Sequence, residues 1–190
     1  LSVAMAGASQ EALSAHLLRS DGQEDLCFAL WRPSSGHERR TALLQTPLLP
    51  LPGERHVHGN ASFEPDFLLR AAAEAAAQGA GLAFLHSHPG AHGWQCMSVS
   101  DRRAEERIAN VARETTGYPL VGLTLAGGDG GWSARVWDRG GGRDIAPTEC
   151  ATVRSLDSGL NITFNGKVVP VPAASETQVR TIDAWGPTMQ

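Results

Sequence analysis

Long hydrophobic runs are missing from this sequence, and so is any sign of a disulfide framework. No apolar stretch approaches the roughly 20 residues that a membrane-spanning helix needs, so we expect no membrane partner. The three cysteines, Cys27, Cys96 and Cys150, are odd in number and widely spaced, which does not fit a disulfide scaffold. Because free thiols suit a reducing compartment, we expect the cytoplasm.

An excess of basic residues is also missing. Sixteen Lys and Arg stand against twenty Asp and Glu, which gives a formal net charge of −4, and Lys167 is the one lysine. This balance provides no attraction to nucleic acid, so we predict no nucleic-acid partner. The 190 residues, of which 42% are hydrophobic, suffice for one well-buried domain.

Helical and strand-like patterns alternate along the chain. They predict an α/β fold, a mixed α+β arrangement in which helices flank a central mixed sheet, in one domain that ends near residue 172. The predicted helices cover 11–20, 66–78 and 98–117. The other predicted elements are strands at 24–31, 82–88 and 119–127, an edge or bulged strand within 41–55, a short strand at 56–63, a strand with one solvated face at 132–138, a loop at 139–149 and a hairpin at 160–171.

A group of metal-capable side chains follows the strand at 82–88. His86 and His88 are two residues apart, and residues i and i+2 of a strand point to the same face, so both imidazoles can reach one cation. Asp101 stands where the next helix begins. Two histidines and a carboxylate leave a fourth tetrahedral position open, as in catalytic zinc sites. We therefore predict that His86, His88 and Asp101 bind Zn²⁺.

Each of these residues also has an ordinary structural interpretation. Isolated histidines are more often core or surface residues than ligands, and Ser98 with Asp101 fits the capping box of a helix. The combination of "HSHP" after an apolar strand with "SVSD" at a helix start favours the metal site. His56 and His58 form a second His-x-His that lacks a following acid motif, and we interpret it as part of a surface strand.

The segment between the two halves of this pattern contains three further candidates. His92 could touch the metal, although a loop histidine is more often solvated. Cys96 is a soft ligand that could occupy the open position. Trp94 would either line a channel for an extended peptide or cap the core, and its sequence context fits both.

The stretch "HSHPGAHGWQCMSVSD" resembles the JAMM (MPN+) metalloprotease motif, which reads His-x-His-Pro, a spacer and Ser-x-x-Asp. The resemblance extends over about residues 11–140 and implies the JAMM/MPN fold, which is cytidine-deaminase-like. One departure is the spacer between Pro89 and Ser98, whose eight residues exceed the family's usual length and include two glycines. We expect this extra length to form a bulge in a loop.

The resemblance also implies a general base on an early strand. Glu24 in "GQEDLCFALW" is the best match because it leads an apolar strand, and its other interpretation is an exposed acid at a strand start. In the roles that the family implies, Glu24 takes a proton from water and passes it to the leaving amine. The hydroxyl of Ser98 donates to the developing oxyanion.

A JAMM domain that has all of its metal-ligand residues resembles enzymes that cleave after the C-terminal glycine of a ubiquitin-like protein. The resemblance therefore implies this function, and it is the one we expect. The tail "VRTIDAWGPTMQ" looks like the lead-in to a ThiF/E1-type adenylating domain. The chain then divides into a JAMM/MPN+ domain at 1–172 and, at 173–190, a linker with the start of a truncated ThiF/E1-like domain. The expected partners are a ubiquitin-like substrate, that E1/ThiF-like domain and an E2-like protein, in a bacterial conjugation system active against phage.

Specificity for glycine would come from a narrow channel, because a residue without Cβ lets the backbone approach closely. We expect the loop at 90–97, with Trp94, to border this channel.

Two other classes of function compete. A catalytically silent MPN module would dock a ubiquitin-like protein or an E1 or E2 partner without hydrolysis, and the intact ligand set argues against it. A cytidine deaminase needs His-x-Glu followed by Pro-Cys-x-x-Cys, and this sequence has "HSH" and no Cys-x-x-Cys.

Overall fold

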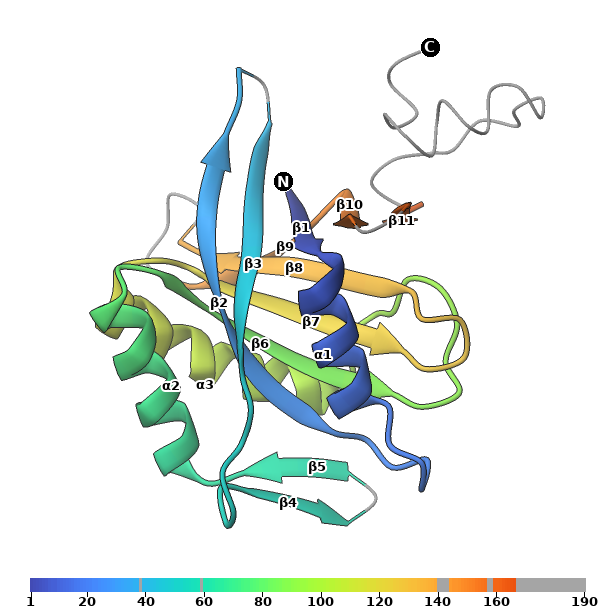
Figure 1. Cartoon of the computed structure of the whole chain (residues 1–190). Helices are drawn as coiled ribbons and strands as arrows, with labels where there is room; N and C mark the ends of the chain where they lie inside the picture. The colour runs from blue at the N-terminus through green and yellow to red at the C-terminus, as the bar shows by residue number, and fades with distance from the viewer. Residues whose placement is uncertain (38, 59, 140–143, 157–158, 167–190) are drawn as a thin grey trace, which may run out of the picture.

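The computed structural model describes residues 1–37, 39–58, 60–139, 144–156 and 159–166 (Figure 1). Over these residues a nine-stranded mixed sheet has the order β11-β10-β1-β3-β2-β6-β7-β8-β9, and β4 and β5 form a separate hairpin. In chain order the elements are β1 Ser2–Ala6, α1 Gly7–Leu17, β2 Leu26–Ser35, β3 Arg40–Leu48, β4 Arg55–His58, β5 Asn60–Phe63, α2 Pro65–Ala77, β6 Gly81–His88, α3 Val99–Thr116, β7 Leu120–Ala126, β8 Trp132–Asp138, β9 Ala146–Glu149, β10 Thr152–Leu156 and β11 Leu160–Phe164.

Strand β6 lies near the centre of the sheet and is buried on both faces, as its apolar sequence predicts. Helices α2 and α3 lie on one side of the sheet and α1 on the other (Figure 1). The even-numbered side chains of β6, such as Phe84, pack with residues of α2 and α3, and its odd-numbered ones, such as Leu85, pack with residues of α1. Because side chains alternate along a strand, His86 and His88 face the α2–α3 side, and Ser87 faces the α1 side.

The three predicted helices are confirmed as α1, α2 and α3. Helix α1 begins at Gly7, four residues before the predicted start. Helix α2 has Pro65 in its first turn, and α3 follows the N-cap Ser98. The segment at 56–63 forms not one strand but the β4–β5 hairpin.

The proline-containing segment at 41–55 was expected to be an edge strand or a bulged one, and β3 is bulged. It pairs with β2 with a shift of register between Ala29 and Trp31. Although β3 lies between β1 and β2, its pairing with β1 ends at Leu44. Pro47 therefore lies beyond the end of β1 and needs no backbone donor on that side.

Several strands differ from the sequence predictions. Strands β1 and β10, which pair with each other in parallel, were not predicted, because five residues are too short to give a clear period. The expected loop at 139–149 contains β9, an edge strand in which Pro147 is tolerated. Strand β2 continues through Pro33 to Ser35, beyond the predicted end at Trp31.

The C-terminal predictions fall largely outside the described residues. Strand β11 pairs antiparallel with β10, and the second strand of the hairpin predicted at 160–171 lies mostly beyond residue 166. The linker and the start of a ThiF/E1-like domain, predicted at 173–190, lie entirely outside them. None of the described helices is long and apolar enough to cross a membrane.

The solvated face expected for the strand at 132–138 is wrong, since β8 is buried from Trp132 to Trp137. Its polar side faces α3, where Arg135 pairs with Glu105, and their side chains are 1% and 0% exposed. The guanidinium donates from Nε to Glu105 Oε2 at 2.8 Å and from Nη2 to Oε1, and Trp137 Nε1 donates to Oε2 at 2.6 Å. A fully satisfied ion pair thus replaces the expected contact with water.

Gly122 of β7 provides the space for this ion pair. A Cβ atom at this position would overlap the carboxylate of Glu105 and lie 2.8 Å from Arg135 Nε. Because both side chains are fixed by their mutual hydrogen bonds, neither can easily move away.

We expect Gly122→Ala to lower the free energy of unfolding by about 1–3 kcal/mol, the usual cost of overpacking. Urea denaturation measures this change. Gly159→Ala is the matched control, because a Cβ there meets no atom within 4 Å. Equal stabilities of the two variants would contradict the assignment of Gly122 as a space-making residue.

Candidate metal centre

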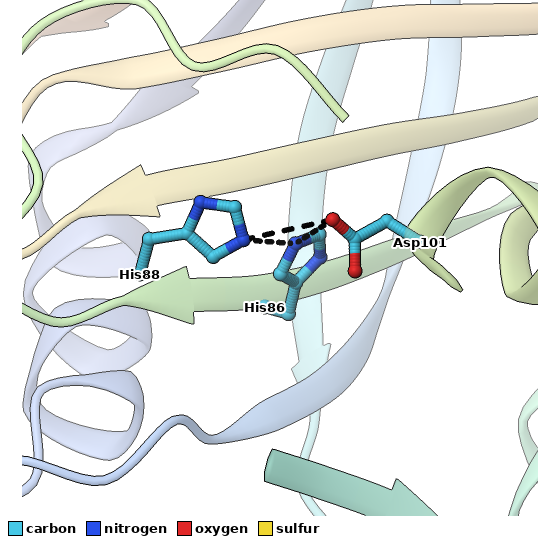
Figure 2. Close-up of side chains that lie close together, drawn as sticks. All are labelled: His86, His88 and Asp101. Carbon is cyan, nitrogen blue, oxygen red and sulfur yellow. Dashed lines mark hydrogen bonds and ion pairs between the residues drawn. The ribbon is translucent and has the colours of Figure 1, made fainter. Parts of the chain in front are cut away.

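The three predicted ligands converge where β6 ends and α3 begins (Figure 2). Nε2 of His86 lies 3.2 Å from Nε2 of His88, and Asp101 Oδ2 lies 4.0 Å and 3.7 Å from these two atoms. Ligand atoms around a tetrahedral zinc stand about 3.3–3.4 Å apart, so the site fits after the carboxylate moves by about half an ångström. Within the described residues, these three side chains form a cluster that could hold a metal ion.

The start of α3 fixes the carboxylate of Asp101. Ser98 N donates to Asp101 Oδ2 at 2.9 Å, and Asp101 N donates to Ser98 Oγ at 3.1 Å, which completes a capping box. Oδ2 is also the oxygen nearest to both histidines. Asp101 can therefore cap helix α3 and serve as a candidate ligand at the same time, because the capping hydrogen bonds orient the oxygen that faces the metal position.

The surroundings of the three side chains determine the protonation states that a metal ion would encounter. Burial lowers the pKa of His86 to about 3, and the nearby charge of Arg135 adds to this effect, so His86 is neutral. The carboxylate of Asp101, whose Oδ2 lies 3.7 Å from His88 Nε2, raises the pKa of His88, and the same contact holds the pKa of Asp101 well below its usual range. Since a metal needs neutral imidazoles and an ionised carboxylate, His88 is the candidate ligand at which protons would compete with a metal.

Glu24 comes just before β2 and lines the same cavity as His86 and Asp101. Partial burial raises its pKa, Asp101 adds to this effect, and His88 opposes it. The cavity has a volume of about 440 Å³. Its apolar walls include Leu26, Ala61, Phe63, Leu68, Phe84 and Ile108, from both β-structure and helices. A carboxylate with a raised pKa thus stands beside the metal position and an apolar space.

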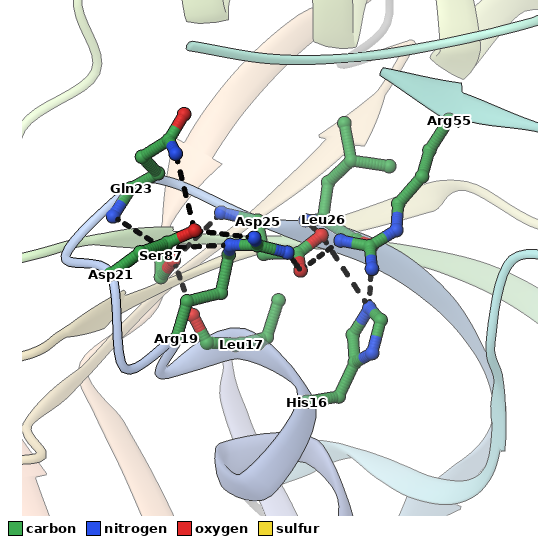
Figure 3. Close-up of polar contacts among 9 residues, drawn as sticks. All are labelled: His16, Leu17, Arg19, Asp21, Gln23, Asp25, Leu26, Arg55 and Ser87. Atoms are coloured by element: carbon green, nitrogen blue, oxygen red, sulfur yellow. Dashed lines mark hydrogen bonds and ion pairs between the residues drawn. The ribbon is translucent and has the colours of Figure 1, made fainter. Parts of the chain in front are cut away.

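A cluster of polar residues lies on the face of β6 opposite to the one that carries the two histidines (Figure 3). Asp25, whose side chain is 1% exposed, accepts from Arg55 and, at 3.5 Å, from Arg19. Asp25 N donates to Ser87 Oγ at 3.1 Å, and Ser87 N donates to the carbonyl of Asp25 at 3.0 Å. These bonds join the residue after Glu24 to the residue between the two histidines. Asp25 and Ser87 belong to no sequence motif, so the sequence does not identify them.

Ser98, the predicted oxyanion donor, is exposed at the start of α3, and its Oγ lies 2.7 Å from that of Ser100. Trp94 packs against the core on the α1 side, donates from Nε1 to Glu149 at 3.2 Å, and is not among the residues that line the cavity. Its position is that of a core cap, and its role in substrate binding stays a prediction.

The other candidate residues do not join the cluster of three. His56 lies in the β4–β5 hairpin, as expected for a surface strand, with its Nε2 2.7 Å from a carboxylate oxygen of Glu64. Cys96 is exposed in the loop before α3. That loop is fastened to the turn after β7, since Gly93 N donates to Asp129 at 2.7 Å.

Comparisons with known proteins bear on the fold alone. No protein-family model matches the sequence, and no curated protein matches it significantly. The solution structure of protein DSY2949 from Desulfitobacterium hafniense is similar, with a TM-score of 0.50 and 15% sequence identity over 82% of this chain and 93% of that one. This similarity agrees with a single mixed α+β domain.

We expect the metal-stripped protein to bind one zinc ion per chain. His88→Ala and Asp101→Ala should each abolish tight binding, because two ligands cannot hold a tetrahedral ion firmly. Isothermal titration calorimetry measures stoichiometry and affinity. His56→Ala is the control and should bind as the wild type does. Wild-type affinity in Asp101→Ala would exclude the carboxylate as a ligand.

The zinc affinity should fall as the pH decreases, and the fall should begin above the value of about 6.5 for a free imidazole. The reason is that the pKa of His88 is raised, so its protonated form persists to a higher pH and must lose a proton before it binds metal. Competition with a chromophoric chelator, repeated across this range, measures the effect. An affinity that stays constant through neutral pH would contradict it.

Proposed function

We propose that this domain is a zinc-dependent peptidase or isopeptidase of the JAMM/MPN+ type. The observation that carries the proposal is one cavity lined by Glu24, a potential base, together with the potential ligands His86 and Asp101. The His-x-His-Pro and Ser-x-x-Asp pattern supports the same conclusion, as does the open fourth position of a three-ligand site.

The side chains suit amide hydrolysis. A zinc ion held by His86, His88 and Asp101 would supply the Lewis acidity that polarises a carbonyl and acidifies water. Glu24 accepts a proton from the attacking water and delivers it to the leaving amine nitrogen, and a raised pKa helps a carboxylate to carry out both steps. The Ser98 hydroxyl donates to the oxygen that becomes negative during attack.

The proposed substrate is the extended C-terminal tail of a ubiquitin-like protein, cut after its terminal glycine. Strand β5 supports binding of such a tail, because it pairs with β4 on one side only within the described residues. Three of its residues, Ala61, Ser62 and Phe63, line the cavity beside the metal position. A tail added at the free edge of β5 would gain main-chain hydrogen bonds and lead directly to the site.

The wider setting of the proposal is a bacterial ubiquitin-like conjugation system in the cytoplasm, with a ThiF/E1-like domain and an E2-like protein as partners and a role against phage. It rests on the resemblance of the motif and of the tail at 179–190.

We expect the zinc-loaded protein to release a short C-terminal extension from a ubiquitin-like protein encoded beside it. Glu24→Gln should abolish cleavage and still bind zinc, because the amide cannot accept the proton and Glu24 is not assigned as a ligand. Mass spectrometry of the products and a parallel zinc titration measure the two properties.

One control variant and two possible outcomes test this assignment. Glu64→Gln changes an exposed carboxylate outside the lining of the cavity and should cleave normally. Equal cleavage by the wild type and Glu24→Gln would exclude Glu24 as the base. Zinc binding and tail binding without any cleavage would instead identify a silent docking module.

A further inference from the structure

Helix α3 forms one wall of the cavity beside the metal position. Asp101, Ala104 and Arg107 of this helix line the cavity, and their spacing of three residues places them along one side of the helix. Strand β5 lines the same cavity through residues 61–63. A peptide tail added to the edge of β5 would therefore run through a space that α3 also borders.

The side chain of Arg107 is folded back along α3. Its Nε donates to the carbonyl oxygen of Arg103, one turn earlier, at 3.1 Å. Side chains of a helix lean toward its N-terminus, so the guanidinium points toward the end of α3 at which Asp101 lies. It lies within two helical turns of Asp101, or about 11 Å along the helix. At about 3.3 Å per residue, roughly three residues of an extended tail span that distance.

The terminal nitrogens of Arg107 have no carboxylate partner in the part of the chain that the structure describes. Arg113, farther along the same helix, does have one, since it pairs with Asp138 at 3.1 Å. Glu24 and Asp101 line the cavity with Arg107, but neither forms an ion pair with it. The cavity therefore presents one arginine whose charge is available to a ligand.

We propose that Arg107 is a specificity-determining residue: its guanidinium selects a tail that carries an acidic side chain close to the scissile bond, and it repels a basic one. The proposal rests on the proposed function, because it requires a peptide tail in this cavity. Other walls, formed by Leu26, Phe84 and Ile108, are apolar and offer no side-chain donor to a substrate carboxylate. Attraction of one charge and repulsion of the other together give the discrimination.

The test uses fluorescein-labelled, amidated peptides of valine and threonine that end in glycine and contain one variable residue. This residue is glutamate, glutamine or lysine, placed at the second, third or fourth position before the glycine. The peptides are titrated with zinc-loaded protein that carries Glu24→Gln, so that no peptide is cleaved. Fluorescence anisotropy measures each Kd.

A glutamate peptide should bind about two- to fivefold more tightly than its glutamine counterpart at one or more positions, as an ion pair open to solvent allows, and the lysine peptide should bind most weakly. Adding Arg107→Glu should reverse this order. Arg103→Glu is the matched control, because it changes the charge of the same helix equally and Arg103 does not line the cavity. It should preserve the order, and added salt should weaken the preference.

The outcomes separate this proposal from the one on which it rests. The same order of affinities in the Arg107→Glu and Arg103→Glu proteins would overturn the role of Arg107. Equal binding of the glutamate, glutamine and lysine peptides at every position would overturn it as well. If no peptide binds at all, the tail-binding part of the proposed function fails, and the proposal about Arg107 fails with it.

Discussion

The buried ion pair between Glu105 and Arg135 ties α3, which carries the candidate ligand Asp101, to β8 of the sheet that carries His86 and His88. Asp101 precedes Glu105 by four residues, so both lie on the same face of α3. The contact that draws Glu105 against β8 therefore also places Asp101 beside the end of β6. Arg135 Nη1 further donates to Thr124 at 2.8 Å, and Thr124 Oγ1 lies 3.4 Å from His86 Nε2. Because apolar residues often stabilise an interior as well as a buried ion pair does, we infer that this pair mainly defines position.

The sequence was informative where short-range order determines structure. The placement of His86 and His88 on one face of a strand, and of Ser98 and Asp101 at one helix start, can be predicted from only a few neighbouring residues. The alanine-rich helix α2 can be predicted from the sequence in the same way. Partners distant in the chain were not: Arg135 was expected on a solvated face, because nothing near it shows that Glu105, 30 residues away, would cover it.

Glu24 and Asp25 show how adjacent acids acquire different surroundings. Glu24 lines the cavity on one side of the sheet, whereas Asp25 is buried among arginines on the other. The place of Glu24 before an apolar strand makes it a candidate from the sequence, whereas no sequence pattern marks Asp25. Arg55, a partner of Asp25, belongs to β4, so the hairpin that forms one wall of the cavity is tied to the residue beside the candidate base.

The loop from Pro89 to Met97 joins two candidate ligands, His88 and Asp101, that are already held by other parts of the molecule. His88 ends a central strand, and Asp101 is fixed by its capping box and by Glu105 one turn later. Closing a longer loop costs little, about 0.6 kcal/mol for each doubling of length. The length and side chains of this loop can therefore change at little cost in free energy without displacing His88 or Asp101.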